Sequence, residues 1–71
     1  MSAKTNYALA SLDSTHTGYL YRLKRSAETG NEAYKKELRA VIRGYLVALN
    51  NAGMISDSEY RTLYCYFTIN L

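Results

Sequence analysis

The most constraining feature of the sequence is a regular spacing of apolar residues between Glu32 and Asn50. These residues recur three, four and seven positions apart, which places them on one side of an α-helix. They are Tyr34, Leu38, Val41, Ile42, Tyr45, Leu46 and Leu49. Asn31 can cap the start of this helix, and Gly53 suits the left-handed position just after its end. We therefore predict a helix over residues 32–50, about 28 Å long.

A second helix is predicted over residues 57–71. Ser56 and Glu59 have the spacing of a capping box, in which each side chain bonds to the other residue's backbone N–H group. Ile55 and Tyr60 stand where a hydrophobic staple would close over the helix start. The apolar face of this helix would contain Tyr60, Leu63, Tyr64, Phe67 and Leu71. Because the connecting loop is short, we expect the two helices to form an antiparallel hairpin.

The first half of the chain carries weaker signals. We predict a short helix over residues 4–12, capped by Ser2, followed by a polar loop over residues 11–18. Residues 19–28 fit a helix, although the alternation at residues 19–24 also fits a strand. A lone strand would have no partner elsewhere in the chain, so we favour the helix. The prediction is one compact all-α domain of three or four helices spanning residues 1–71, built on the C-terminal hairpin.

Composition and the few reactive residues argue against an enzyme. No apolar run approaches the roughly 18 residues of a membrane helix, and the N-terminus does not resemble a secretory signal. We therefore expect a small cytoplasmic protein. The single cysteine, Cys65, cannot form an internal disulfide, and nothing in the sequence brings His16 to it as a base. Capping accounts for Asp57 and Glu59. We predict no catalytic site, no cofactor and no metal site.

The net charge of +3 permits binding to nucleic acid. Two groups of cations could contact phosphates if they share a face, and Tyr19 and Tyr21 could stack on unpaired bases. The groups are Arg22, Lys24 and Arg25, and then Lys36, Arg39 and Arg43. A helix-turn-helix reader with Gly53 in its turn is rejected, because its second helix would begin with acidic residues that repel phosphate. The alternative is that these cations only contact solvent.

A protein partner is the interpretation that we favour. The chain has eight tyrosines, and tyrosine and arginine are enriched at binding hot spots. Tyr66 and Ile69 point away from the apolar face of the last helix, so a partner could cover them, with Arg39 and Arg43 supplying polar contacts. A second copy of the chain is one candidate partner, since a thin core gains from dimerisation. The alternative is that the N-terminal helix covers these residues within the same chain.

Two resemblances add to this interpretation. Within residues 46–60, the pattern of Gly53, Ile55, Ser56, Glu59 and Tyr60 resembles the short C-terminal oligomerisation domain of bacterial proteins, which implies pairing of two short helices. The whole chain resembles, in size and in its 44–68 stretch, small accessory proteins of phages and integrative elements of gut-dwelling Firmicutes. That likeness implies an inhibitor or adaptor, anti-CRISPR proteins included. Because this chain is basic, we expect it to cover a partner's surface rather than to mimic nucleic acid.

Overall fold

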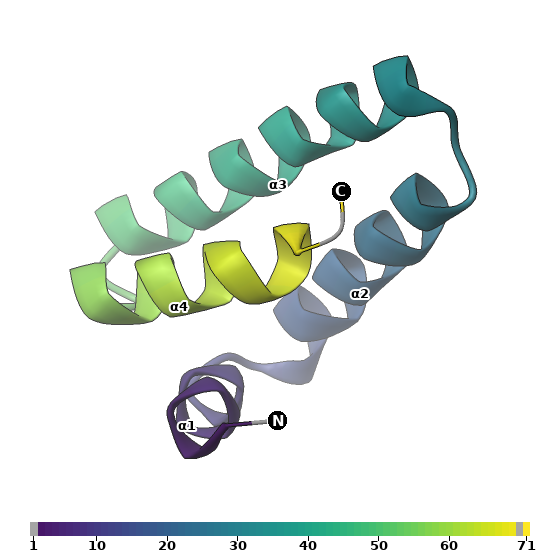
Figure 1. The fold of residues 1–71 in the computed structure, drawn as a ribbon. Coiled ribbons are helices and arrows are strands. Elements are labelled where there is room, and N and C mark those ends of the chain that lie inside the picture. Colours follow the sequence, from purple (N-terminus) through teal and green to yellow (C-terminus); the bar gives the residue numbers. More distant parts are fainter. Residues whose placement is uncertain (1, 70) are drawn as a thin grey trace.

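The computed structural model describes residues 2–69 and 71, and these residues form four α-helices and no strand. The helices are α1 (Ala3–Ala10), α2 (Ser14–Glu28), α3 (Glu32–Asn51) and α4 (Asp57–Thr68). In Figure 1, α3 and α4 lie side by side as the predicted hairpin, α2 runs beneath them, and α1 is seen end-on below α4. The all-α prediction is confirmed, and the strand alternative for residues 19–24 is wrong because that segment lies inside α2.

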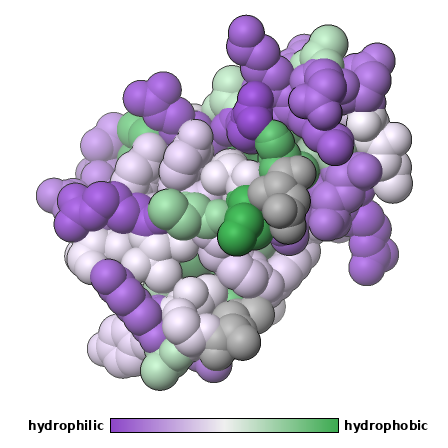
Figure 2. Space-filling view, viewed as in Figure 1, coloured by the Kyte–Doolittle hydropathy of each residue, from purple (hydrophilic) through white to green (hydrophobic). Residues whose placement is uncertain are grey.

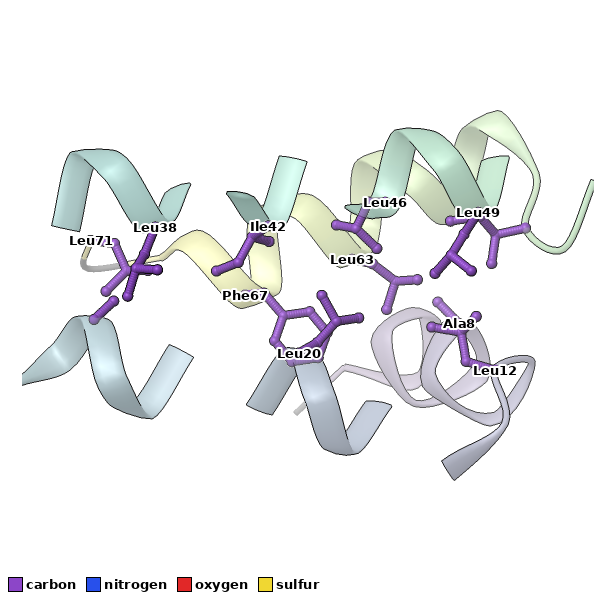
Figure 3. Packing of buried hydrophobic residues seen from close by; sticks show 12 residues of the cluster. Ala8, Leu12, Leu20, Leu38, Ile42, Leu46, Leu49, Leu63, Phe67 and Leu71 are labelled. Atoms are coloured by element: carbon purple, nitrogen blue, oxygen red, sulfur yellow. The ribbon is translucent and has the colours of Figure 1, made fainter. Parts of the chain in front are cut away.

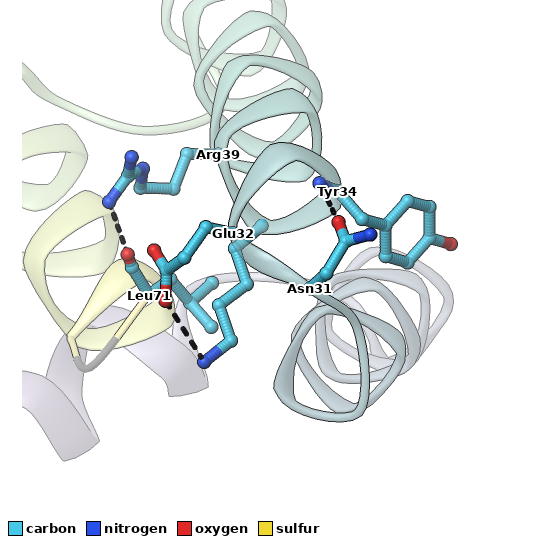
Figure 4. Close-up of polar contacts among 6 residues, drawn as sticks. Asn31, Glu32, Tyr34, Arg39 and Leu71 are labelled. Carbon is cyan, nitrogen blue, oxygen red and sulfur yellow. Dashed lines mark hydrogen bonds and ion pairs between the residues drawn. The ribbon is translucent and has the colours of Figure 1, made fainter.

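Helix α3 follows the predicted apolar stripe closely. Asn31 caps it, because its side-chain oxygen accepts a hydrogen bond of 2.9 Å from the backbone N–H of Tyr34 (Figure 4). The residues that α3 buries are Leu38, Ile42, Leu46 and Leu49. Two members of the predicted stripe, Tyr34 and Val41, are instead 39% and 40% exposed. The buried face of α3 is therefore narrower than the spacing predicted.

The loop between α3 and α4 is built from the expected capping groups. Gly53 has a φ of +76°, the left-handed conformation that glycine adopts without steric cost. Both bonds of the capping box form: the Ser56 side chain accepts from the Glu59 N–H at 3.1 Å, and Glu59 accepts from the Ser56 N–H at 2.8 Å. Asn50 adds bonds of 3.0 Å to the Ile55 carbonyl and to the Asp57 carboxylate. These bonds fix where α4 begins.

Helix α4 ends at Thr68, three residues before the predicted end. Leu71 is nevertheless buried, close to Leu38 of α3 (Figure 3). The guanidinium of Arg39 donates a hydrogen bond to the Leu71 carbonyl (Figure 4). The Leu71 side chain therefore packs beyond the end of α4 and covers part of the N-terminal half of α3.

Helix α2 begins at Ser14, so the predicted polar loop over residues 11–18 is wrong for its second part. Asp13 caps the helix by accepting a bond of 2.7 Å from the Thr15 N–H. This bond lowers the pKa of the Asp13 carboxyl. The first turns of α2 are polar because they lie largely on the surface. Only Ser11, Leu12 and Asp13 separate α1 from α2.

The core lies between the hairpin on one side and α1 and α2 on the other. Its centre consists of Leu20, Ile42, Leu46, Leu63 and Phe67, which are fully buried. Figure 3 shows Ala8 and Leu12 closing the end near α1. Helix α4 packs against each of the other three helices, whereas α1 packs mainly on α4. The seam between α1 and α4 is therefore flanked by few other elements. No helix in the described part of the chain is long and apolar enough to cross a lipid bilayer.

Candidate functional site

A groove follows the seam between α1 and α4. It consists of two adjoining hollows of about 510 and 440 Å³, which share Lys4 and Thr62 in their walls. We call it the α1–α4 groove. The first hollow is lined by Lys4, Tyr7, Ala8, Ser56, Ser58, Glu59 and Thr62, and the second by Lys4, Thr5, Arg61, Thr62, Cys65, Tyr66 and Ile69.

The α1–α4 groove holds the two most exposed large hydrophobic side chains of the described residues. Tyr7 is 76% exposed and Ile69 is 59% exposed. Sequence reasoning selected Ile69 and Tyr66, and the structure places both in the second hollow. It missed Tyr7. The sequence did carry a signal for Tyr7. Ala8 and Leu12 are four residues apart and mark the buried side of the N-terminal segment, and Tyr7 does not lie on that side.

Tyr66 is more constrained than the sequence predicted. It is partly buried and packs against the core rather than standing free. Its hydroxyl is hydrogen-bonded at 2.8 Å to the hydroxyl of Tyr21 on α2. The ammonium of Lys24 lies 5.7 Å from the centre of its ring, within the range of a cation–π contact. Tyr66 therefore forms a fixed wall of the groove, and Ile69 is the exposed apolar group beside it.

The electrostatics of the α1–α4 groove are positive with one acidic end. Backbone bonding to Ser56, followed by a bond of 2.7 Å from the Ser11 hydroxyl, lowers the pKa of Glu59. The Glu59 carboxylate therefore stays ionised, and its oxygens accept hydrogen bonds from within the chain. Among residues 2–69 and 71, the only ion pair within 4.0 Å joins Lys35 to Glu32. Lys4 and Arg61 therefore form no ion pair within these residues, although the ionised Glu59 carboxylate lines the same hollow as Lys4.

The two predicted groups of cations are arranged differently. Arg22, Lys24 and Arg25 line one hollow of about 420 Å³ on α2, together with Gly18, Tyr21 and Glu28. Lys36, Arg39 and Arg43 do not line it. Lys36 and Arg43 are exposed on α3, whereas Arg39 is partly buried and bonded to Leu71. Figure 2 shows hydrophilic side chains gathered at the end where α2 meets α3.

The tyrosines predicted to stack on bases pack against other aromatic rings, and they stay 38% (Tyr19) and 39% (Tyr21) exposed. Tyr19 lies 4.8 Å from Tyr45, measured between ring centres. Tyr21 lies edge-on to Tyr66 at 6.0 Å and to Phe67 at 5.0 Å. Part of the surface of each ring is therefore in contact with another aromatic side chain of the chain.

His16 and Cys65 have different surroundings. The Nδ1 atom of His16 is hydrogen-bonded at 2.5 Å to the hydroxyl of Tyr45, and this bond connects the start of α2 to α3.

Cys65 is exposed on α4 and lines the α1–α4 groove. No group of three or more potential metal ligands occurs within residues 2–69 and 71.

Comparisons of the chain with protein-family models, with curated proteins and with solved structures give no significant match. The two resemblances noted in the sequence stay predictions.

Proposed function

We propose that this chain is a non-enzymatic protein-interaction module that binds an apolar segment of a partner protein in the α1–α4 groove. The observation that carries the proposal is the placement of Tyr7 and Ile69 in adjoining hollows along one seam. Exposed apolar groups gathered in a groove are typical of sites that bind another protein. Amphipathic helices commonly bind in such grooves, with their apolar side chains at helical spacing.

The charges along the groove indicate the chemistry of the partner. Lys4 lines both hollows and Arg61 lines the second. Acidic side chains flanking the apolar residues of the segment would pair with these cations and orient it. The proposed partner segment is therefore amphipathic and acidic. Arg39 and Arg43, which the sequence suggested as polar contacts, line neither hollow, so the proposal rests on Lys4 and Arg61 instead.

A small protein that binds such a segment covers it. This is the action expected of an inhibitor or adaptor, and it agrees with the resemblance to accessory proteins of phages and integrative elements. The module would act by occluding a surface of its partner, anti-CRISPR-like activity being one form of this. No step of this action requires a catalytic group.

The test is a selection of binding peptides from a random linear library. We expect the selected peptides to carry apolar residues at helical spacing together with Asp or Glu. Ile69→Asp should weaken their binding by about tenfold or more, since apolar residues inside a binding groove dominate the affinity. The control is Val41→Asp, which places the same charge at another exposed apolar position, on α3 and outside the groove, and should leave binding unchanged.

Three results would contradict the proposal. Peptides that bind both variants equally would place the contact outside the groove. Basic peptides would contradict the role of Lys4 and Arg61. A dimer in light scattering that becomes a monomer in Ile69→Asp would assign the groove to a second copy of the chain instead of an acidic partner.

A further inference from the structure

We propose that the outer face of α2 is a second binding site, which holds the phosphate backbone of a nucleic-acid duplex. Arg22, Lys24 and Arg25 line one shallow hollow there, against the single carboxylate of Glu28. Tyr7 and Ile69 do not line this hollow. The site is therefore separate from the α1–α4 groove, and either proposal can fail without the other.

The cations of this hollow are available to an external anion. Within the described residues, none of the three forms an ion pair with a carboxylate, including Glu28. Lys24 rests over the ring of Tyr66, which positions its ammonium without neutralising it. Arg22 and Arg25 are exposed. Guanidinium groups can bond to phosphate oxygens through two parallel N–H groups, so this pair is well suited to a phosphodiester.

The shape of the face favours close approach of a backbone. Gly18, Arg22 and Arg25 follow one another at spacings of four and three residues, which places them on one row of the helix. Apart from the adjacent residues and the backbone of α2 itself, no heavy atom lies within 4 Å of where a Cβ at Gly18 would stand. A polymer can therefore approach the main chain of α2 at Gly18 while the two arginines hold its phosphates.

The aromatic contacts decide between a duplex and a single strand. Binding of single strands depends on aromatic rings whose faces are open to stack on bases. Tyr21, the aromatic residue of this hollow, is 39% exposed, but its ring is held perpendicular to Tyr66 and Phe67 and its hydroxyl is bonded to Tyr66. Because this one ring is fixed in place and the other polar groups of the hollow are three cations and a carboxylate, the dominant contacts are those to phosphate, which position a duplex without identifying its sequence.

The experiment measures fluorescence anisotropy of the full chain with a labelled, mixed-sequence duplex of about 20 base pairs over a series of salt concentrations. Three phosphate contacts predict a slope of about −2.7 in log K against log salt. The double variant R22Q/R25Q should reduce that slope by about 1.8 and weaken binding about tenfold or more at low salt. The matched control K36Q/R43Q removes the same charge from exposed positions of α3 and should change affinity by less than about threefold.

Circular dichroism establishes that both double variants fold. Equal weakening in the two variants would overturn the α2 site in favour of diffuse attraction by the net charge. Tighter binding to the single strand than to the duplex would overturn the choice of a duplex. Heparin that competes with the duplex at equal charge concentration and shows the same dependence on Arg22 and Arg25 would identify a general polyanion site instead. Absence of binding at low salt would end the proposal.

Discussion

The hydroxyl of Tyr21 on α2 is hydrogen-bonded to the hydroxyl of Tyr66 on α4, over a distance of 2.8 Å. Their rings meet edge to face, and both also pack edge-on against Phe67, which is fully buried. This cluster joins the core to both candidate sites, because Tyr21 lines the hollow on α2 and Tyr66 lines the α1–α4 groove. Burial of Tyr21, and then this hydrogen bond, raise the pKa of its hydroxyl, which predicts a dependence of stability on alkaline pH.

Stability should fall as the pH rises from about 10 to about 12. Burial, and then the hydrogen bond and charge of Tyr66, raise the pKa of Tyr21 to about 12 from the ordinary value of 10.0. The unfolded chain therefore loses its Tyr21 proton first, and stabilisation present below pH 10 is lost through this window. Urea unfolding across the range should show a shallower decline for Tyr21→Phe. An equally steep decline in that variant would show that Tyr21 does not control it.

Two glycines should respond in opposite directions to alanine. A Cβ at Gly30 would stand 3.0 Å from Cγ of Tyr34 and closer still to the ring edge. That ring is tethered, since the Tyr34 hydroxyl is bonded at 2.9 Å to Ser26. Gly30→Ala should therefore cost about 1–3 kcal/mol, the usual range for overpacking. Gly44 lies inside α3 with open space around it, so Gly44→Ala should add about 0.5–1 kcal/mol.

Urea denaturation of the two variants checks this pair directly. Gly44→Ala serves as the control for Gly30→Ala, because it adds the same methyl group where nothing obstructs it. Stabilisation by both substitutions would contradict the close approach of Tyr34 to Gly30.

The capping box predicts that replacing Ser56 lowers the stability of the fold, whereas replacing Ser58, two residues further on, does not. Ser56→Ala removes the acceptor for the Glu59 N–H and should cost about 1 kcal/mol, because a helix start loses its cap. Ser58→Ala changes an exposed residue in the first turn of the same helix and should stay within about 0.5 kcal/mol of the parent. Thermal unfolding of both variants separates the two effects. Equal losses would show that the effect does not come from the Ser56 cap, since alanine has the higher helix propensity and would not destabilise the helix at position 58.

The parts of the fold that could be predicted are those that depend on residues close together in the sequence. The start of α4 follows from Ser56 and Glu59 alone, and the buried side of α3 follows from helical spacing. The start of α2 could not be predicted in this way, because its first turns are polar and resemble a loop. Only Asp13 marks the boundary, through a cap that is equally typical of a turn.

The same distinction applies to the candidate sites: some of their residues could be predicted from local spacing, and others depend on how the helices pack. Ile69 could be selected from a helical wheel, since it lies off the apolar face of its own helix. The bond between Tyr21 and Tyr66 joins residues 45 positions apart. It depends on how α2 and α4 pack, which no local pattern specifies. The contact of Arg39 with Leu71 is of the same kind, and it removed Arg39 from the set of freely exposed cations.

The last prediction tests the rotational phase of α3, on which the core depends. Leu46 is fully buried, and Val47, the next residue, is 37% exposed. Leu46→Ala should cost roughly 2–5 kcal/mol, because it removes buried methyl groups and leaves a cavity. Val47→Ala should cost far less, because its side chain is already in partial contact with water. Equilibrium urea unfolding measures both.

If Leu46→Ala is too unstable to fold, Ile42→Val offers a smaller change on the same buried face, with an expected cost of about 0.5–1.5 kcal/mol. A cost below about 0.5 kcal/mol for Leu46→Ala would mean that this face of α3 is not the one in the core. The α3–α4 hairpin would then have to pack by another surface. The positions of Arg43 and Lys36 would move with it, so the same measurement also checks the control used for the site on α2.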